Sequence, residues 1–228
     1  MNTSFAYRGV YEKLFSAYGP RRWWPGDSAF EIMVGAVLTQ NTAWINVEKA
    51  IANLKRARML SAKAIIETHP RRVAMLIRPS GYFNVKAKRL RALCRWVVAE
   101  GGLRRLARMS TEKLRHALLA VHGIGPETAD DILLYAFERP VFVIDAYTRR
   151  VFARLGAIKG PEPYEALRQA FEVSLGEDVP LYNEYHALIV RHGKETCRKK
   201  PLCHSCCLAT VCFSRTDDGV RNPSDSQY

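Results

Sequence analysis

The chain has 228 residues, a length that suits one large or two modest domains, each with its own core. Lysine and arginine number 35 against 22 acidic residues, and this formal charge of +13 indicates a polyanionic partner without distinguishing DNA from RNA or a membrane surface. The chain has no secretory pattern and no apolar run near the ~20 residues that cross a bilayer, so we expect a cytoplasmic protein in a reducing compartment.

Apolar residues recur at helical spacing along nearly the whole chain, and a strand pattern is strong only at 141–144. Glycine and proline pairs separate the helical segments, as at Pro25-Gly26 and Gly160-Pro161. These signals predict an all-α fold. The expected helices span 6–18, 28–38, 42–56, 62–68, 71–77, 84–100, 111–121, 126–137, 146–155, 163–174 and 181–192.

Two polar or aromatic segments interrupt this helical pattern early in the chain. Adjacent tryptophans at 23 and 24 precede Pro25-Gly26 and lie outside any helical stripe. Either both pack in the core, or one indole is exposed and can stack on a nucleobase. Gln40-Asn41-Thr42 lies between two predicted helices, where Asn41 or Thr42 can serve as a helix cap.

A Gly-Ile-Gly turn at 123–125 joins an apolar helix to a helix that begins at Pro126. Glycine permits positive φ values and lets another molecule approach the backbone closely. Proline suits the first helical position, and the free N–H groups of a helix start can bind a phosphate. The pattern predicts a helix-hairpin-helix that binds the nucleic-acid backbone, with an ordinary tight helical corner as the alternative.

The β-branched and aromatic residues at 141–144 lead directly to Asp145, and a basic helical pattern follows. Aspartate is a frequent N-cap residue, and from this segment alone the N-cap role is the better interpretation.

Four cysteines lie within sixteen residues near the C-terminus in a C-x5-C-x2-C-x5-C pattern: Cys197, Cys203, Cys206 and Cys212. Their loop is short and basic, so a metal is expected to order it. Four thiolates suit tetrahedral zinc or a 4Fe-4S cluster, and spacing does not separate these. Cys207 is an alternative to Cys206, which keeps the C-x2-C pair and is favoured. Cys94 belongs to an apolar helical stretch and is expected to pack in the core.

Taken together, the hairpin and the aspartate about twenty residues later resemble the helix-hairpin-helix plus Gly/Pro…Asp signature of the endonuclease III superfamily of DNA base-excision glycosylases. The resemblance covers residues 5–215. It implies a six-helix domain, 28–136, that ends in the hairpin, and a helical domain of 1–27 plus 137–228 with an iron–sulfur cluster loop and a disordered tail, 215–228. It also implies that Asp145 is catalytic and lies at the cleft between these domains.

The same resemblance implies a structural 4Fe-4S cluster on the four cysteines, although the first gap here is one residue shorter than in relatives. The segments Trp-Trp-Pro, Leu-Thr-Gln-Asn-Thr and Gly-Ile-Gly-Pro-Glu-Thr-Ala-Asp are most similar to the 3-methyladenine glycosylase branch. A base pocket is thereby implied at Trp24, Pro25 and Trp44. Implied DNA contacts are Gln40, Asn41, Gly123, Gly125 and Thr128.

Bifunctional endonuclease III enzymes carry a lysine two residues after the second hairpin glycine, where its amine forms a Schiff base. This chain has Glu127 there, and a carboxylate cannot form that imine, so no AP-lyase activity is expected. Glu127 either shapes the base pocket or is an ordinary acidic residue of a first helical turn. Lys194 matches a family position near the catalytic aspartate, and it either tunes that carboxylate, binds a phosphate or lies on the surface.

The prediction is a monofunctional DNA glycosylase that removes alkylated purines such as 3-methyladenine and acts as a monomer on duplex DNA containing a damaged base. A nucleoid association is expected if the source is bacterial or archaeal. The first alternative is a mismatch uracil/thymine or oxidised-pyrimidine glycosylase of the endonuclease III type. The second is a non-catalytic iron–sulfur DNA-binding protein.

Overall fold

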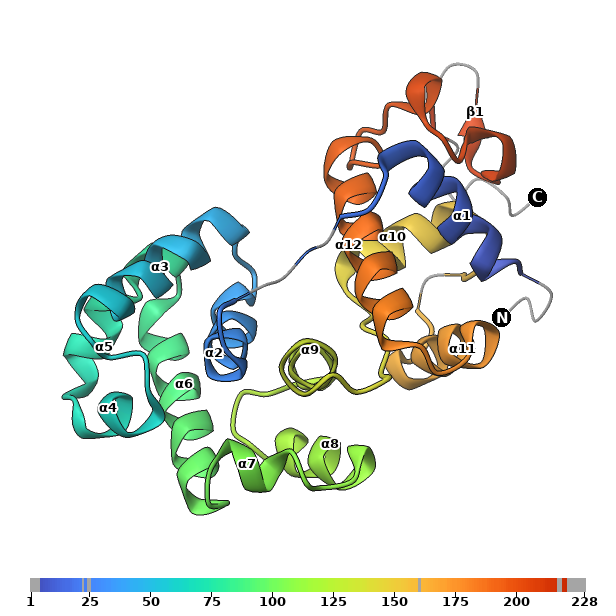
Figure 1. Cartoon of the computed structure of the whole chain (residues 1–228). Helices are drawn as coiled ribbons and strands as arrows, with labels where there is room; N and C mark the ends of the chain where they lie inside the picture. Colours follow the sequence, from blue (N-terminus) through green and yellow to red (C-terminus); the bar gives the residue numbers. More distant parts are fainter. Residues whose placement is uncertain (1–4, 22, 24–25, 160, 217–218, 221–228) are drawn as a thin grey trace. The chain divides into compact units, whose positions relative to one another are not determined.

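The structure is a computed structural model that describes residues 5–21, 23, 26–159, 161–216 and 219–220. Its contacts divide the chain into two compact units. Unit 1 contains Met1–Trp23 and Pro140–Tyr228, and unit 2 contains Trp24–Arg139. Helices dominate both units, which confirms the all-α fold (Figure 1).

Unit 2 is built around one helix, α2 (Ala29–Thr39), whose residues are buried on nearly every side. A helix that is apolar all round belongs inside a core, and the Ser28 hydroxyl caps its start by accepting a hydrogen bond from the N–H of Glu31. The remaining helices of unit 2 are α3 (Trp44–Arg56), α4 (Ala62–Glu67), α5 (Pro70–Leu76), η1 (Arg78–Ser80), α6 (Phe83–Ala99), α7 (Leu103–Leu106), α8 (Thr111–Leu119), α9 (Pro126–Asp131) and the π-helix η2 (Ile132–Ala136).

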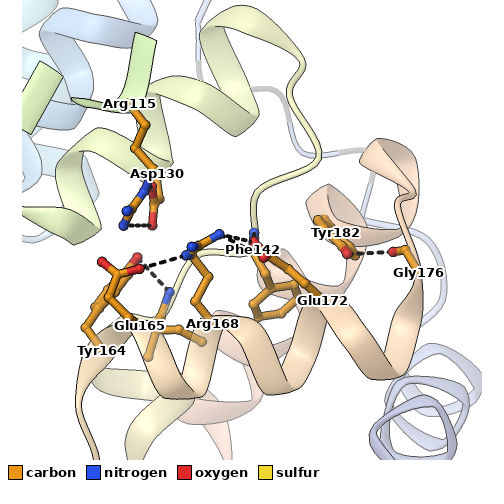
Figure 2. Close-up of polar contacts among 10 residues, drawn as sticks. Arg115, Asp130, Phe142, Tyr164, Glu165, Arg168, Glu172, Gly176 and Tyr182 are labelled. Carbon is orange, nitrogen blue, oxygen red and sulfur yellow. Dashed lines mark hydrogen bonds and ion pairs between the residues drawn. The ribbon is translucent and has the colours of Figure 1, made fainter. Parts of the chain in front are cut away.

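A buried ion pair joins the two helices on either side of the Gly-Ile-Gly turn. Arg115 on α8 donates from Nε to Asp130 Oδ1 at 2.6 Å and from Nη2 to Asp130 Oδ2 at 3.1 Å (Figure 2). The Asp130 side chain is fully buried and that of Arg115 is 15% exposed. This paired geometry fixes α9 against α8 because both carboxylate oxygens are bound by one planar guanidinium.

Unit 1 contains α1 (Tyr7–Tyr18), α10 (Ala146–Arg154), α11 (Tyr164–Leu175) and α12 (Val179–Glu195). Aromatic side chains from these helices and from the segment just before α10 pack in its core. Phe142 stacks on Phe171 with ring centroids 4.2 Å apart, and Tyr7 stacks on Phe152 at 5.5 Å. The loop after α12 contains the short turns η3 (Cys203–Ser205) and η4 (Ala209–Val211).

The segment at 141–144 is extended and buried, and in the part of the chain that the structure describes it belongs to no sheet. Side chains of α11 bind its backbone N–H groups instead (Figure 2). Phe142 N donates to Glu172 Oε1 at 3.0 Å, and Ile144 N donates to the Tyr164 hydroxyl at 3.3 Å. Arg168 holds Glu172 through Nη1 at 2.8 Å. The strand pattern therefore reflects a buried extended segment that leads to Asp145.

Most predicted helices occur within two residues of the expected bounds, because apolar spacing and capping residues mark them locally. Two predictions need correction. The one-turn helix α7 was not expected, since four residues show no periodicity. The tail was expected to be disordered from 215, but β1 (Arg215–Thr216) pairs antiparallel with β2 (Gly219–Val220). Ser214 N donates to Arg154 O at 2.9 Å and so holds the chain at α10 where β1 begins. Residues 217–218 and 221–228 of that tail lie outside the described residues.

Among the helices of the described chain, none combines the length and the apolar character that a membrane span requires.

Replacing Asp130 with asparagine should lower the free energy of unfolding by about 2–4 kcal/mol, because it removes the fully buried carboxylate from its ion pair with Arg115. The matched control is Glu67→Gln, which removes the exposed Lys63–Glu67 pair at 3.8 Å and should cost less than about 1 kcal/mol. Urea unfolding measures both. Equal small losses would show that the buried pair does not hold the hairpin helices together.

Candidate catalytic site and nucleic-acid interface

Asp145 occupies the N-cap of α10, where the buried extended segment meets the helix. Its Oδ1 accepts a hydrogen bond from Thr148 N at 2.6 Å and another from the Thr148 hydroxyl at 2.8 Å. Thr148 is buried, so these bonds are shielded from water. The N-cap interpretation and a chemical role are thus compatible, because capping uses one carboxylate oxygen and leaves Oδ2 to other partners.

The pKa of Asp145 is set by opposing causes. Burial acts to raise it, but His186 first and the Thr148 donors second outweigh burial, and the pKa of this carboxyl lies below its ordinary value. His186 Nε2 lies 3.6 Å from Asp145 Oδ2, and the two side chains are 5% and 13% exposed. The ring of Trp23 lies 6.2 Å from that of His186. Asp145 is therefore a carboxylate held ionised in a largely water-excluded setting.

Lys194 lies beside the ring of Tyr147, which belongs to the first turn of α10. Its Nζ is 5.8 Å from the ring centroid of Tyr147, two residues after Asp145, and the Arg150 guanidinium is 5.1 Å from the same ring. Gly193 allows this packing, because a Cβ there would lie 2.6 Å from a Tyr147 ring carbon. The Lys194 side chain is exposed, so its ammonium remains accessible beside the helix that Asp145 caps.

The two hairpin glycines differ in their surroundings. Gly123 has φ +84°, and a Cβ there would lie 2.2 Å from Cγ of Arg89, so backbone and packing both require glycine. Gly125 has φ −93° and does not use the positive φ that glycine permits. Among the described residues, no atom lies within 4 Å of the place where a Gly125 Cβ would stand. The protein's own packing therefore does not require glycine at 125.

Gln40 is bound to the hairpin by hydrogen bonds at both ends of its amide. Its Nε2 donates to Gly123 O and to the Thr128 hydroxyl, each at 3.0 Å, and its Oε1 accepts from Arg89 Nη1 at 2.5 Å. Asn41 next to it is exposed and has φ +52°. The loop after α2 and the hairpin thus form one polar surface, on which the Asn41 side chain is exposed.

Lys86 supports this loop from beneath. Its Nζ donates to Leu38 O at 2.9 Å, to the Thr42 hydroxyl at 2.6 Å and to Ser80 O at 2.6 Å. Burial, with Arg89 as the second cause, lowers the pKa of Lys86 to about 8. The lysine therefore fixes the end of α2 and the start of the polar loop by bonds that a shorter or apolar residue cannot make.

Of the remaining residues expected at the base pocket, the structure describes Trp44 and Glu127. Trp44 begins α3, and its indole packs on α2, where a Cβ at Gly35 would lie 3.3 Å from the ring. Glu127 is exposed in the first turn of α9. Trp24 and Pro25 lie outside the described residues. Unit 2 thus contains Trp44, Glu127 and the hairpin residues, whereas unit 1 contains Asp145, Lys194 and the cysteines.

The four cysteines of the C-x5-C-x2-C-x5-C pattern line one pocket, together with Arg154, Thr196, Pro201, Leu202 and Ser214. Arg154 Nη1 donates a hydrogen bond to Cys197 Sγ at 3.3 Å. Cys207 is absent from this lining and lies near Tyr18. Cys94 is fully buried on α6, as expected of a packing residue. Among the described residues, no three His, Cys, Asp or Glu side chains are arranged around a single metal ion.

Sequence reasoning missed several residues that surround the candidate groups. The Asp-x-x-Thr spacing of an N-cap motif could have indicated Thr148. His186, Arg89 and Glu172 carry no comparable signal, because each reaches its partner across a long sequence separation.

Comparison with known proteins gives a consistent family assignment. Residues 34–177 match the family described as HhH-GPD superfamily base excision DNA repair protein. A Methanocaldococcus jannaschii protein named as a DNA repair glycosylase is 44% identical over 209 residues, which are 90% of this chain and 95% of the relative. Endonuclease III of Thermotoga maritima is 30% identical over 200 residues, 86% of this chain and 89% of the relative.

Two solved structures share the fold. A 3-methyladenine DNA glycosylase from H. pylori, crystallised with 1,N6-ethenoadenine, has a TM-score of 0.72 and 31% identity and covers 82% of this chain and 96% of its own. An endonuclease III in a non-covalent complex with DNA has a TM-score of 0.78 at 20% identity and covers 90% of this chain and 93% of its own.

Proposed function

Since the chain belongs to the HhH-GPD superfamily of base excision DNA repair proteins, we propose that it is a monofunctional DNA glycosylase that hydrolyses the N-glycosidic bond of alkylated purines such as 3-methyladenine. The observation that carries this proposal is Asp145, an ionised carboxylate anchored at a helix start with one oxygen left available. The similarity to the 3-methyladenine DNA glycosylase supports the substrate class.

In the proposed reaction Asp145 acts on the sugar. As the bond to the base breaks, positive charge develops on the deoxyribose, and a fixed carboxylate in a water-poor site stabilises that charge. The same carboxylate orients a water molecule and accepts its proton as the oxygen bonds to the sugar. An alkylated purine carries a positive charge and leaves as a neutral base, so no strong general acid is needed.

Glu127 is the reason for proposing hydrolysis without strand cleavage. It stands two residues after the second hairpin glycine, where an amine would be needed to form an imine with the opened sugar. A carboxylate has no such chemistry. We assign Glu127 to shaping the entrance of the base pocket and Lys194 to the phosphate or carboxylate beside the start of α10, consistent with its exposed ammonium near Tyr147.

The proposed base pocket consists of Trp24, Pro25 and Trp44. Stacking on aromatic rings contributes about 1–3 kcal/mol per base. A base made cationic by alkylation gains a further cation–π attraction of about 0.5–2 kcal/mol. Electron-rich indoles therefore favour an alkylated purine over a neutral normal base.

The proposed DNA contacts come from the hairpin and the polar loop bound to it. Free space at Gly125 leaves room for a phosphate to approach the backbone. Thr128 and Gly123 are held in place by Gln40, which supports the adjoining loop. The exposed Asn41 is suited to enter the space that a flipped nucleotide vacates. The charge of +13 fits duplex DNA as the partner, with the protein acting as a monomer.

We further propose that the C-terminal loop binds a 4Fe-4S cluster through Cys197, Cys203, Cys206 and Cys212. Each cysteine of such a cluster binds a different iron, so the ligands surround a volume rather than a point. A pocket lined by all four thiols fits that requirement, and Arg154 lies beside Cys197 at its edge. The bound cluster would supply order to a loop that has little apolar surface of its own.

A panel of duplexes carrying N-methylpurines, 1,N6-ethenoadenine, mismatched uracil or thymine, and oxidised pyrimidines tests the activity. Release of the alkylated base, with strand breaks only after alkali, is the expected result. Asp145→Asn should reduce the single-turnover rate by about 100-fold or more while duplex binding is retained. Its control is Glu67→Gln, on the surface of unit 2.

Other results of this panel select the alternatives. Strand cleavage without alkali, or an adduct trapped by borohydride, would indicate a lyase of the endonuclease III type. Excision of mismatched or oxidised pyrimidines, without excision of alkylated purines, would refute the alkylpurine substrate and support the first alternative. If neither the wild type nor Asp145→Asn released any base, the protein would be a non-catalytic DNA-binding protein.

The hairpin glycines provide a matched pair for DNA binding. Gly123→Ala should destabilise the fold by about 1–2 kcal/mol, because φ is positive and Arg89 occupies the space. Gly125→Ala should change stability by less than about 1 kcal/mol yet weaken duplex binding several-fold, because the new methyl group lies where a phosphate would. Urea unfolding and fluorescence anisotropy measure the two effects. Full binding by the folded Gly125→Ala variant would contradict the assignment.

Cys206→Ser and Cys207→Ser form the matched pair for the cluster. The protein purified without oxygen should be brown and contain iron and sulfide in equal amounts. Cys206→Ser should lose most of both, whereas Cys207→Ser should retain them, because Cys207 does not line the pocket. Zinc in place of iron, or the opposite response of the two variants, would refute the ligand assignment.

A further inference from the structure

The two oxygens of Asp145 have different neighbours. Both Thr148 donors bind Oδ1, at 2.6 and 2.8 Å. Oδ2 instead faces His186 Nε2 at 3.6 Å. Because the capping bonds occupy Oδ1, Oδ2 is the oxygen that can serve the sugar or a water molecule. The group beside Oδ2 is therefore an imidazole, the side chain whose ordinary pKa lies closest to neutral pH.

His186 approaches Asp145 from a different helix. It lies on α12, which packs against α10 and α1 (Figure 1), and its side chain is only 5% exposed. The Trp23 ring lies 6.2 Å from its ring at an interplanar angle of 42°. A buried imidazole whose Nε2 faces a buried carboxylate is coupled to it electrostatically, because little water separates the two.

Several charged or titratable groups on the packed helices have partners other than His186. On α10, Arg149 binds Glu162 O, and Arg150 binds Gly193 O and Cys197 O. On α1, Arg8 binds Leu175 O and Tyr18 binds His192. On α12 itself, Arg191 pairs with Glu195, and Glu184 accepts a hydrogen bond from Arg21 N. His186 itself faces Asp145, with which it forms an ion pair when protonated.

We propose that His186 is a positioning residue for Asp145, which orients Oδ2 and, when it takes up a proton, cancels the carboxylate charge that the reaction uses. This inference rests on the proposed function in assigning Asp145 to the reaction. With a neutral imidazole, the pair carries one negative charge beside the developing positive sugar. With an imidazolium, the pair is neutral and the sugar loses that stabilisation.

The direction of the pH effect follows from this charge balance. Imidazoles ordinarily titrate near pH 6.5 and aspartates near 3.9, so the imidazole takes up its proton first as the pH falls. The pKa of Asp145 lies below its ordinary value because His186 and Thr148 outweigh burial, so the carboxylate is still ionised there. The glycosylase rate should therefore fall on the acid side at the pH where His186 titrates, well before Asp145 itself is protonated.

A pH–rate profile of His186→Gln tests this claim. Glutamine places an amide nitrogen near the position of Nε2 but does not titrate. Duplex DNA carrying N3-methyladenine and N7-methylguanine is the substrate, because these bases leave without a proton and the acid limb then reports groups of the protein. The midpoint of that limb should move to lower pH by about one unit or more in His186→Gln. It should not move in the control His116→Gln, an exposed histidine of α8. The same midpoint in all three proteins would overturn the proposal.

An NMR titration tests the same coupling without substrate. The His186 imidazole signal, assigned by its loss in His186→Gln, should titrate about 1–3 pH units lower in Asp145→Asn than in the wild type, because the opposite charge is gone. An unchanged imidazole titration would overturn the proposal even if the enzyme is active. Inactivity on methylated DNA with the expected NMR shift would refute the proposed function alone.

Discussion

The hydrogen bonds from Thr148 to Oδ1 of Asp145 are the interaction on which the candidate catalytic site depends. They begin α10, and at the same time they fix the orientation of a carboxylate whose other oxygen faces His186. A free aspartate on a loop would sample several rotamers and would be hydrated. Capping a helix removes that freedom, since two donors three residues ahead hold one oxygen in place.

The rest of unit 1 supports this helix start from several sides. Glu172 and Tyr164 on α11 accept hydrogen bonds from backbone N–H groups of the extended segment 141–144, which precedes Asp145, in place of a neighbouring strand. Arg150 binds the carbonyls of Gly193 and Cys197 and so joins α10 to the end of α12 and the cysteine loop. The cysteine loop is thereby bound to the same helix that Asp145 caps.

Unit 2 shows how similar sequence features can have different physical causes. Gly123 is required by its own backbone angle and by Arg89, whereas among the described residues nothing lies within 4 Å of where a Gly125 Cβ would stand. Arg115 and Asp130 fix the helices on either side of the turn. Gln40 and Lys86 attach the polar loop after α2 to that turn and to α6. The result is a rigid backbone surface, which suits recognition by shape and phosphate position rather than by base identity.

The sequence by itself determined the helices, the hairpin, the cap at Asp145 and the four-cysteine pattern, because each depends on residues close along the chain. Apolar spacing, Gly-Ile-Gly-Pro and Asp-x-x-Thr are local signals of that kind. Only the tertiary structure decided that His186 faces Oδ2, that Cys206 and not Cys207 lines the pocket, and that the 141–144 segment is bound by α11 rather than by a strand. These pairings join residues tens of positions apart, and their partners are chosen by helix packing, which leaves no periodic trace in the sequence.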